Sequence, residues 1–195
     1  MKTFFGLVAV LIAIGGYFPY LKDTFSGKTK PHIFSWFLWC LVSFIAFGIQ
    51  ITNEGGWGSL PNLVMGVICL IIFIKSLSNG TKNIKKLDIF SLVLAMIALV
   101  LWLMVKQPLY SMLIIIVVDF FSFLPTILKS WSKPQEETMI TWILNCVRQI
   151  FIIFSIQEIN FINVIYPIYA LTAVFLFCIM LIIRKRQLSP GYGLA

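Results

Sequence analysis

Apolar residues are gathered into seven runs, separated by short polar connectors rich in glycine, proline and lysine. The runs cover residues 3–21, 32–51, 60–78, 88–105, 109–130, 138–157 and 161–183. A helix needs about 17 to 25 residues to cross a bilayer, and it satisfies its own backbone hydrogen bonds there. The pattern therefore predicts seven membrane-spanning helices.

Composition narrows the class of protein further. The chain has 195 residues, of which 60% are hydrophobic and 11% are charged. Seven spans of roughly 20 residues leave only short connectors and tails, so no water-soluble domain of useful size fits between them. We therefore expect an all-α polytopic membrane protein, and a cytosolic catalytic domain is excluded.

Basic residues predict how the chain lies in the membrane, because positive side chains favour the cytoplasmic side. With the N-terminus outside, 12 of the 15 basic residues fall in cytoplasmic segments: Lys22, Lys28, Lys30, Lys75, Lys82, Lys85, Lys86, Lys129, Lys133, Arg184, Lys185 and Arg186. We expect the N-terminus outside and the C-terminus in the cytoplasm. Since these residues lie in short connectors, membrane lipids are expected partners and nucleic acid is not.

Residue types that serve metal or redox chemistry are sparse. The four cysteines, Cys40, Cys69, Cys146 and Cys178, lie inside apolar runs without CxxC spacing, and His32 is the only histidine. We expect no disulfide framework, no metal site and no cofactor. The chain also has no HExxH motif and no cluster of carboxylates, so an enzyme is not expected.

The two halves of the chain resemble each other. A shift of 106 residues, without gaps, aligns Pro19 with Pro125, Trp36 with Trp142, Cys40 with Cys146 and Pro61 with Pro167. Rare residue types in one register indicate an internal repeat. We expect a first three-helix repeat over residues 1–80, a linker helix over 81–107, a second three-helix repeat over 108–186 and a tail over 187–195. The single linker helix would turn the second repeat to the same orientation as the first, so that two parallel bundles enclose a central cavity.

This repeat leads to a family. The segments Pro19-Tyr20-Leu21-Lys22 and Pro125-Thr126-Ile127-Leu128 end the first helix of each repeat, and Ser35-Trp36 and Thr141-Trp142 follow in the next helix. This 3+1+3 arrangement resembles the SWEET and PQ-loop (MtN3-like) transporter superfamily, although Tyr20 and Thr126 stand where the family has glutamine. The resemblance implies alternating-access transport of a small solute. Residues 30–39 also look like a group of uncharacterised bacterial membrane proteins, which implies a prokaryotic inner membrane.

Two charged residues lie near the centres of predicted spans, Asp119 in 109–130 and Arg148 in 138–157. An unpaired charge at this depth costs about 2.5–3.5 kcal/mol on insertion scales, so we expect the two to pair. Their equivalents in the first repeat are Ala13 and Val42, so the charges belong to one half only. They would serve either ligand binding or proton coupling at the cavity, or a structural ion pair between two helices; the sequence leaves both open.

Polar and aromatic residues surround these charges on the predicted helices. Asn145, Arg148 and Gln149 share one helical face, and Trp36 and Trp39 occupy the matching face of the first repeat. Such side chains line pockets for small polar molecules, or else hydrogen-bond between membrane helices. The expected substrate-binding residues are Asp119, Arg148, Asn145, Gln149, Trp36, Trp39 and Trp142.

Two prolines lie at equivalent positions inside the first helix of each repeat. Pro19 and Pro125 remove backbone hydrogen bonds there, which permits the helix to bend. We expect them to act as hinges of a cytoplasmic gate, and a static kink is the alternative.

Together these features predict a small transporter or facilitator that moves a sugar, a nucleoside or a vitamin-like solute. The alternatives are a non-retinal seven-helix receptor and a structural membrane protein without transport activity. A retinal protein is disfavoured because the span 161–183 has no lysine to form the Schiff base. Association of the chain into a homo-oligomer stays open.

Overall fold

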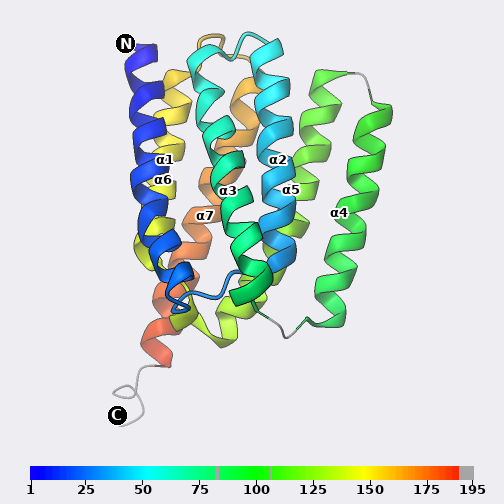
Figure 1. Ribbon diagram of the computed structural model, residues 1–195. Coiled ribbons are helices and arrows are strands. Elements are labelled where there is room, and N and C mark those ends of the chain that lie inside the picture. Colours follow the sequence, from blue (N-terminus) through cyan, green and yellow to red (C-terminus); the bar gives the residue numbers. More distant parts are fainter. Residues whose placement is uncertain (82–83, 106, 189–195) are drawn as a thin grey trace.

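A computed structural model of the protein describes residues 1–81, 84–105 and 107–188 (Figure 1). These residues form seven α-helices: α1 (Lys2–Phe25), α2 (Ile33–Thr52), α3 (Leu60–Asn79), α4 (Lys86–Met104), α5 (Pro108–Ser132), α6 (Met139–Ser155) and α7 (Phe161–Gln187). Short 3-10 turns, Gly56–Gly58 and Pro134–Glu136, precede α3 and α6. The all-helical class is confirmed. Lys82, Lys106 and the tail from residue 189 lie outside the described residues.

Two helices extend beyond the apolar runs that predicted them. The first and last runs end at residues 21 and 183, whereas α1 continues to Phe25 and α7 to Gln187. Hydropathy marks the part of a helix that suits lipid, but the backbone hydrogen bonds continue into the polar region beyond it. Both extra turns are polar and include Lys22 in α1 and Arg184 in α7.

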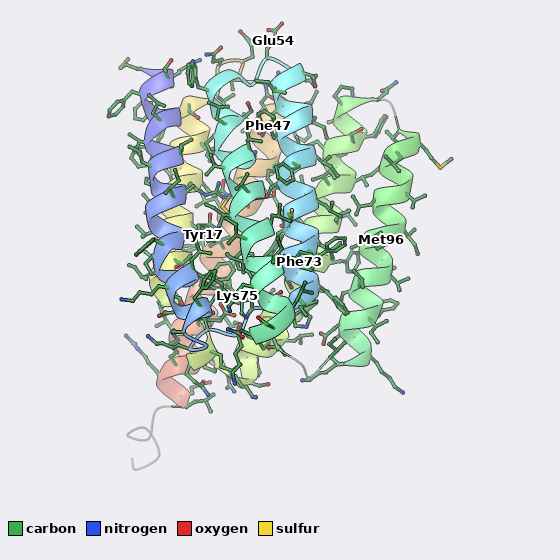
Figure 2. All side chains as sticks on the ribbon, viewed as in Figure 1. Tyr17, Phe47, Glu54, Phe73, Lys75 and Met96 are labelled. Atoms are coloured by element: carbon green, nitrogen blue, oxygen red, sulfur yellow. The ribbon has the colours of Figure 1, made fainter. Side chains whose placement is uncertain are left out.

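The distribution of side chains indicates an integral membrane protein. The segments Lys2–Phe25, Ile33–Thr52, Gly56–Asn79, Pro108–Ser132 and Phe161–Gln187 are long and apolar enough to cross a membrane, and α6 is a shorter apolar helix of 17 residues. Side chains cover the outside of the bundle along its whole length (Figure 2). Large apolar residues such as Phe18 and Phe175 are exposed, while many serine, asparagine and glutamine residues are buried. An exterior this apolar suits lipid rather than water.

Six of the helices form a ring in the order α1, α3, α2, α5, α7, α6, and each packs against its two neighbours. α4 lies outside the ring, against α5 and α2 (Figure 1). The chain direction alternates from helix to helix, so α1 and α5 run the same way (Figure 1). We call the end that holds the N-terminus the amino-terminal end. The opposite end, where segments 26–32 and 133–138 lie, is called the basic end.

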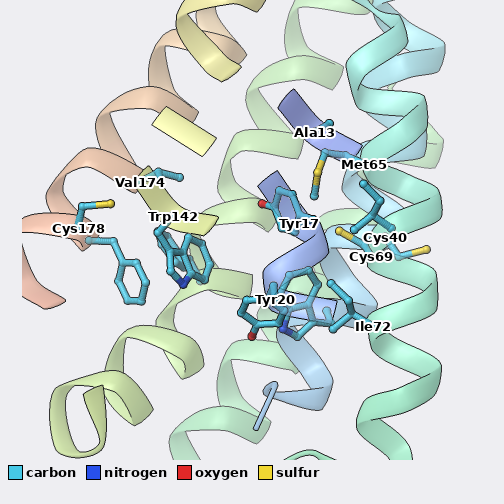
Figure 3. Packing of buried hydrophobic residues seen from close by; sticks show 14 of the residues in the cluster. Ala13, Tyr17, Tyr20, Cys40, Met65, Cys69, Ile72, Trp142, Val174 and Cys178 are labelled. Atoms are coloured by element: carbon cyan, nitrogen blue, oxygen red, sulfur yellow. The ribbon is translucent and has the colours of Figure 1, made fainter. Parts of the chain in front are cut away.

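The core occupies the centre of this ring. Buried residues from all six ring helices form one cluster, which includes Tyr17, Trp36, Cys69, Trp142 and Val174 (Figure 3). Small residues allow the helices to approach closely, as is usual in membranes. A Cβ atom added to Gly6 would lie 2.9 Å from the backbone oxygen of Trp57, whereas one added to Gly15 would meet nothing within 4 Å.

These two glycines of α1 allow a matched test of the packing. Gly6→Ala should lower the free energy of unfolding by about 1–3 kcal/mol, because the added methyl group overpacks against backbone that cannot rotate away. Gly15→Ala should leave stability unchanged or raise it, since alanine is the better helix former. The measurement is the thermal midpoint of each purified variant in the same detergent. Equal midpoints for the two variants would show that the close approach of α1 to Trp57 is wrong.

Candidate functional site

A cavity of about 60 Å³ lies within the ring. All six ring helices contribute to its wall, through residues such as Tyr17, Ser43, Met65, Phe123 and Tyr166. Because the wall comes from both ends of the sequence, the cavity is formed only when α1–α3 and α5–α7 come together.

Every residue that the sequence marked for substrate binding lines this one cavity: Asp119, Arg148, Asn145, Gln149, Trp36, Trp39 and Trp142. The helical spacing explains this result on α6, where the buried residues include Trp142, Asn145, Arg148 and Gln149. Ser43 of α2, one turn beyond Trp39, is also in the wall.

The expected ion pair between Asp119 and Arg148 is not formed; among the described residues, no salt bridge joins the two. Instead, Arg148 Nε donates a 2.9 Å hydrogen bond to Asn145 Oδ1 on its own helix. Asp119 Oδ1 lies 3.5 Å from the hydroxyl of Tyr166 on α7. Equal depth in the membrane was the reason to expect a pair. Each side chain is turned to a different local partner, so depth alone does not bring them into contact.

Aromatic side chains close the cavity towards the basic end. The ring of Tyr20 lies 4.9 Å from that of Trp36 and 6.4 Å from that of Trp142, and all three side chains are buried. Figure 3 shows Tyr20 and Trp142 on this side of the cluster. Trp39 completes the layer, with its ring 6.0 Å from Trp142. The floor of the cavity therefore comes from α1, α2 and α6 together.

A buried ion pair lies directly beyond this aromatic floor. Trp142 Nε1 donates to Glu137 Oε2 at 3.1 Å, and Glu137 Oε1 accepts from Lys129 Nζ. Only 7% of the Lys129 side chain and 1% of the Glu137 side chain are exposed. Lys129 Nζ also donates to the backbone oxygen of Lys30 at 2.9 Å, which joins α5 to the connector between α1 and α2.

Three more contacts at the basic end join α1 and the same connector to the segment before α6. Thr138 Oγ1 donates to Asp23 Oδ2 at 2.8 Å, and it lies 2.7 Å from Thr29 Oγ1. Lys30 Nζ lies 3.5 Å from Glu136 Oε1. The first three helices and the last three are therefore held together at this end by charged and hydroxyl groups.

Amide groups hold the amino-terminal end. Asn62 Nδ2 of α3 donates to Gln50 Oε1 of α2 at 2.7 Å. Asn163 of α7, which is fully buried, donates from Nδ2 to the backbone oxygen of Asn53 at 3.0 Å. Lys2 Nζ adds a contact with the backbone oxygen of Gln157 at 2.8 Å. The cavity is thus bounded at both ends by contacts between the first and last thirds of the chain.

The sequence predicted the tryptophans of the floor but not the charged residues beyond them. Lys129 reads there only as an orientation signal, and Glu136-Glu137 only as part of a connector. A signal was present, because the chain has only seven acidic residues and these two are adjacent, next to a predicted span in an otherwise basic region. The burial of Gln50 and Asn163 was not predicted, because polar residues at the ends of membrane spans usually face water.

The two prolines lie inside continuous helices, Pro19 within α1 and Pro125 within α5. Pro19 precedes Tyr20 of the aromatic floor, and Pro125 is one turn before Lys129. Among the described residues, no group of three or more histidine, cysteine, aspartate or glutamate side chains could hold a metal ion. The chemistry that the cavity offers is therefore recognition by hydrogen bonds, charge and aromatic contact.

Comparisons with protein-family models, curated proteins and solved structures find no match to this chain.

Adjacent glutamates allow a test of the buried ion pair. Glu137→Ala should lower the free energy of unfolding by about 3–5 kcal/mol, because Lys129 is left buried without its partner. Glu136→Ala should cost at most about 1 kcal/mol, since its partners Lys30 and Lys133 are half exposed. Thermal midpoints in detergent measure both. In the double variant Lys129→Met/Glu137→Leu most of the loss should be recovered; a double variant as unstable as Glu137→Ala would contradict the role of the pair.

Proposed function

We propose that the protein is a small secondary transporter or facilitator related to the SWEET and PQ-loop superfamily. Two three-helix units, α1–α3 and α5–α7, are joined by α4 and expose the central cavity alternately to the two sides of the membrane. The observation that carries this proposal is the cavity itself. Its wall comes from both units, and both of its ends are closed by polar contacts between the units.

The pattern of burial supports a repeat of the two units. When α1 is shifted by 106 residues, each of its seven buried residues falls on a buried residue of α5. For α2 and α6, the equivalent pairs Trp36 and Trp142, and Ser43 and Gln149, are buried in both helices. The ring order agrees, because α1–α3–α2 and α5–α7–α6 follow one another with the same neighbours. Two units with one fold and one orientation are what a parallel repeat requires.

In this proposal the two closed ends are gates. The aromatic floor and the Glu137–Lys129 pair form the gate at the basic end, which faces the cytoplasm according to the distribution of lysine and arginine. The amides of Gln50, Asn62 and Asn163 form the gate on the outer side. Pro19 and Pro125 act as hinges beside the cytoplasmic gate, since each frees a backbone carbonyl one turn earlier. In this proposal the protein lies in a prokaryotic inner membrane.

Weakening one gate should expose the cavity from one side only. In a background with the four cysteines replaced, Ser43→Cys places a thiol in the cavity wall. Adding Asp23→Asn and Thr138→Ala removes the contact at the basic end, and hydrogen bonds to charged groups are worth about 1.5–3 kcal/mol. Labelling of the introduced thiol by a membrane-impermeant maleimide should rise roughly tenfold or more from the cytoplasmic side, and stay unchanged from the outside.

Two controls make this test selective. Lys28→Gln removes only the exposed contact of Lys28 with Asp23, at 3.7 Å, and should leave labelling unchanged. Asn163→Ala, at the amino-terminal end, should expose the same thiol from the outside instead. Labelling from both sides in one variant would indicate an open channel, and labelling from neither side in any variant would indicate a structural protein; either result contradicts alternating access.

A further inference from the structure

The cavity wall holds one acidic and one basic side chain that form no salt bridge with each other. Asp119 and Arg148 are 8% and 4% exposed, and both line the wall. Arg148 Nε is bound to Asn145, but its Nη1 is buried with no hydrogen-bond partner. Asp119 faces two tyrosine hydroxyls of α7, that of Tyr166 at 3.5 Å and that of Tyr169. Among the described residues, neither Asp119 nor Arg148 has an oppositely charged partner in a salt bridge, at a depth where charged groups are costly.

The remaining wall suits a cation in one part and a carboxylate in another. Rings of Trp39, Phe123 and Trp142 lie within 6.0 Å of one another beside the cavity. The faces of such rings attract ammonium groups. The guanidinium of Arg148 has a free edge, and this fork-shaped group binds carboxylates through two parallel hydrogen bonds.

We propose that the cavity binds a small zwitterion, with its carboxylate on Arg148 and Asn145 and its ammonium group on Asp119 among the aromatic rings. This inference rests on the proposed carrier function and names its class of substrate. A zwitterion compensates both charges of the wall and adds no net charge to the membrane interior. A neutral sugar would leave both wall charges without a counterion, and a simple anion or cation would leave one.

The size of the cavity agrees with a small solute. Its volume of about 60 Å³ is well below the roughly 300–1,000 Å³ of pockets for drug-sized ligands, which favours a compact molecule such as glycine or alanine.

The first experiment uses the unmodified protein in detergent and a panel of small probes. Glycine, L-alanine and glycine betaine represent zwitterions; acetate and methylammonium represent the separate halves; acetamide and glucose are neutral. Thermal midpoints and tryptophan fluorescence report binding, since a ligand of the folded state raises the midpoint. At least one zwitterion should bind at least about 100-fold more tightly than either half, because each half leaves a buried charge unpaired. Failure of all three zwitterions to bind, or tighter binding of glucose, overturns the proposal.

Two variants test which wall residue holds which group. Asp119→Asn should reverse the preference, so that acetate binds more tightly than glycine. Arg148→Gln should reverse it in the other direction, in favour of methylammonium over glycine. A misfolded variant would lose all binding and could not produce opposite reversals. Lys22→Gln, which removes an exposed charge from α1, should keep the unmodified preference. Unchanged preference for glycine in both cavity variants overturns the assignment.

Uptake measurements separate this inference from the carrier proposal. Proteoliposomes are loaded with glycine, and the entry of labelled glycine is followed. Binding of glycine without any uptake overturns the carrier and leaves the zwitterion site standing. Uptake of labelled glucose that glycine does not inhibit overturns the zwitterion site and leaves the carrier standing. Uptake of glycine that is lost in Arg148→Gln and kept in Lys22→Gln supports both.

Discussion

Polar groups inside a lipid-facing bundle must find their partners within the protein, and this constraint organises the molecule. Lipid tails are as apolar as leucine side chains, so burial of leucine or isoleucine does little to hold the helices together. Close packing and hydrogen bonds between helices hold the bundle together instead. Such hydrogen bonds lie at both ends of the ring, where Glu137 contacts Lys129 and Trp142, and where Asn163 contacts Asn53. The middle of the ring differs, because Arg148 and Asp119 lie there and, among the described residues, neither forms a salt bridge. Both of these side chains line the cavity.

The two ends use different chemistry, and this makes their opening unequal. Charge-assisted hydrogen bonds are roughly twice as strong as those between neutral groups. The basic end therefore has the stronger closed state, with an ion pair, a threonine–aspartate contact and an aromatic layer. Opening it also returns Lys129 and Glu137 to water, which recovers hydration energy that burial had removed. In the proposed carrier, the amide groups at the amino-terminal end lose less hydrogen-bond energy on opening, and they recover less hydration energy. In this carrier, the hydration recovered by Lys129 and Glu137 partly offsets the stronger bonds of the basic end.

Hydropathy and spacing predicted the helices well, because the period of a membrane helix and its length are local properties of the sequence. The same holds for the cavity wall: Trp142, Asn145 and Arg148 share a face of α6 on spacing alone, and the face had to turn inwards because lipid does not accept it. Contacts between helices were beyond this reasoning. The predicted pairing of Asp119 with Arg148 was wrong. Whether two side chains at the same depth meet depends on their rotamers, which the sequence does not specify, and Arg148 instead binds Asn145 on the same helix. Glu137 was missed because a connector residue is ordinarily hydrated, and Lys129 because a lysine in the last turn of a membrane helix ordinarily reaches water. Only the fold brings the two under the aromatic floor.

The proposed repeat and the charges of the cavity lead to one further consequence. Ala13 and Val42, the equivalents of Asp119 and Arg148, are fully buried at matching positions of α1 and α2. If both halves had kept the charges, the cavity would hold two carboxylates and two guanidiniums related by a two-fold axis, and a bound molecule could lie in either direction. With both charged residues in one half and Trp36 and Trp39 in the other, the cavity wall has one acidic group and one basic group, so its charge distribution has a single polarity. A molecule with separated charges can then enter in one orientation only, and the neutral half remains free to move against it. In the proposed carrier, the repeat thus supplies the architecture, and the difference between its halves at two positions supplies the specificity.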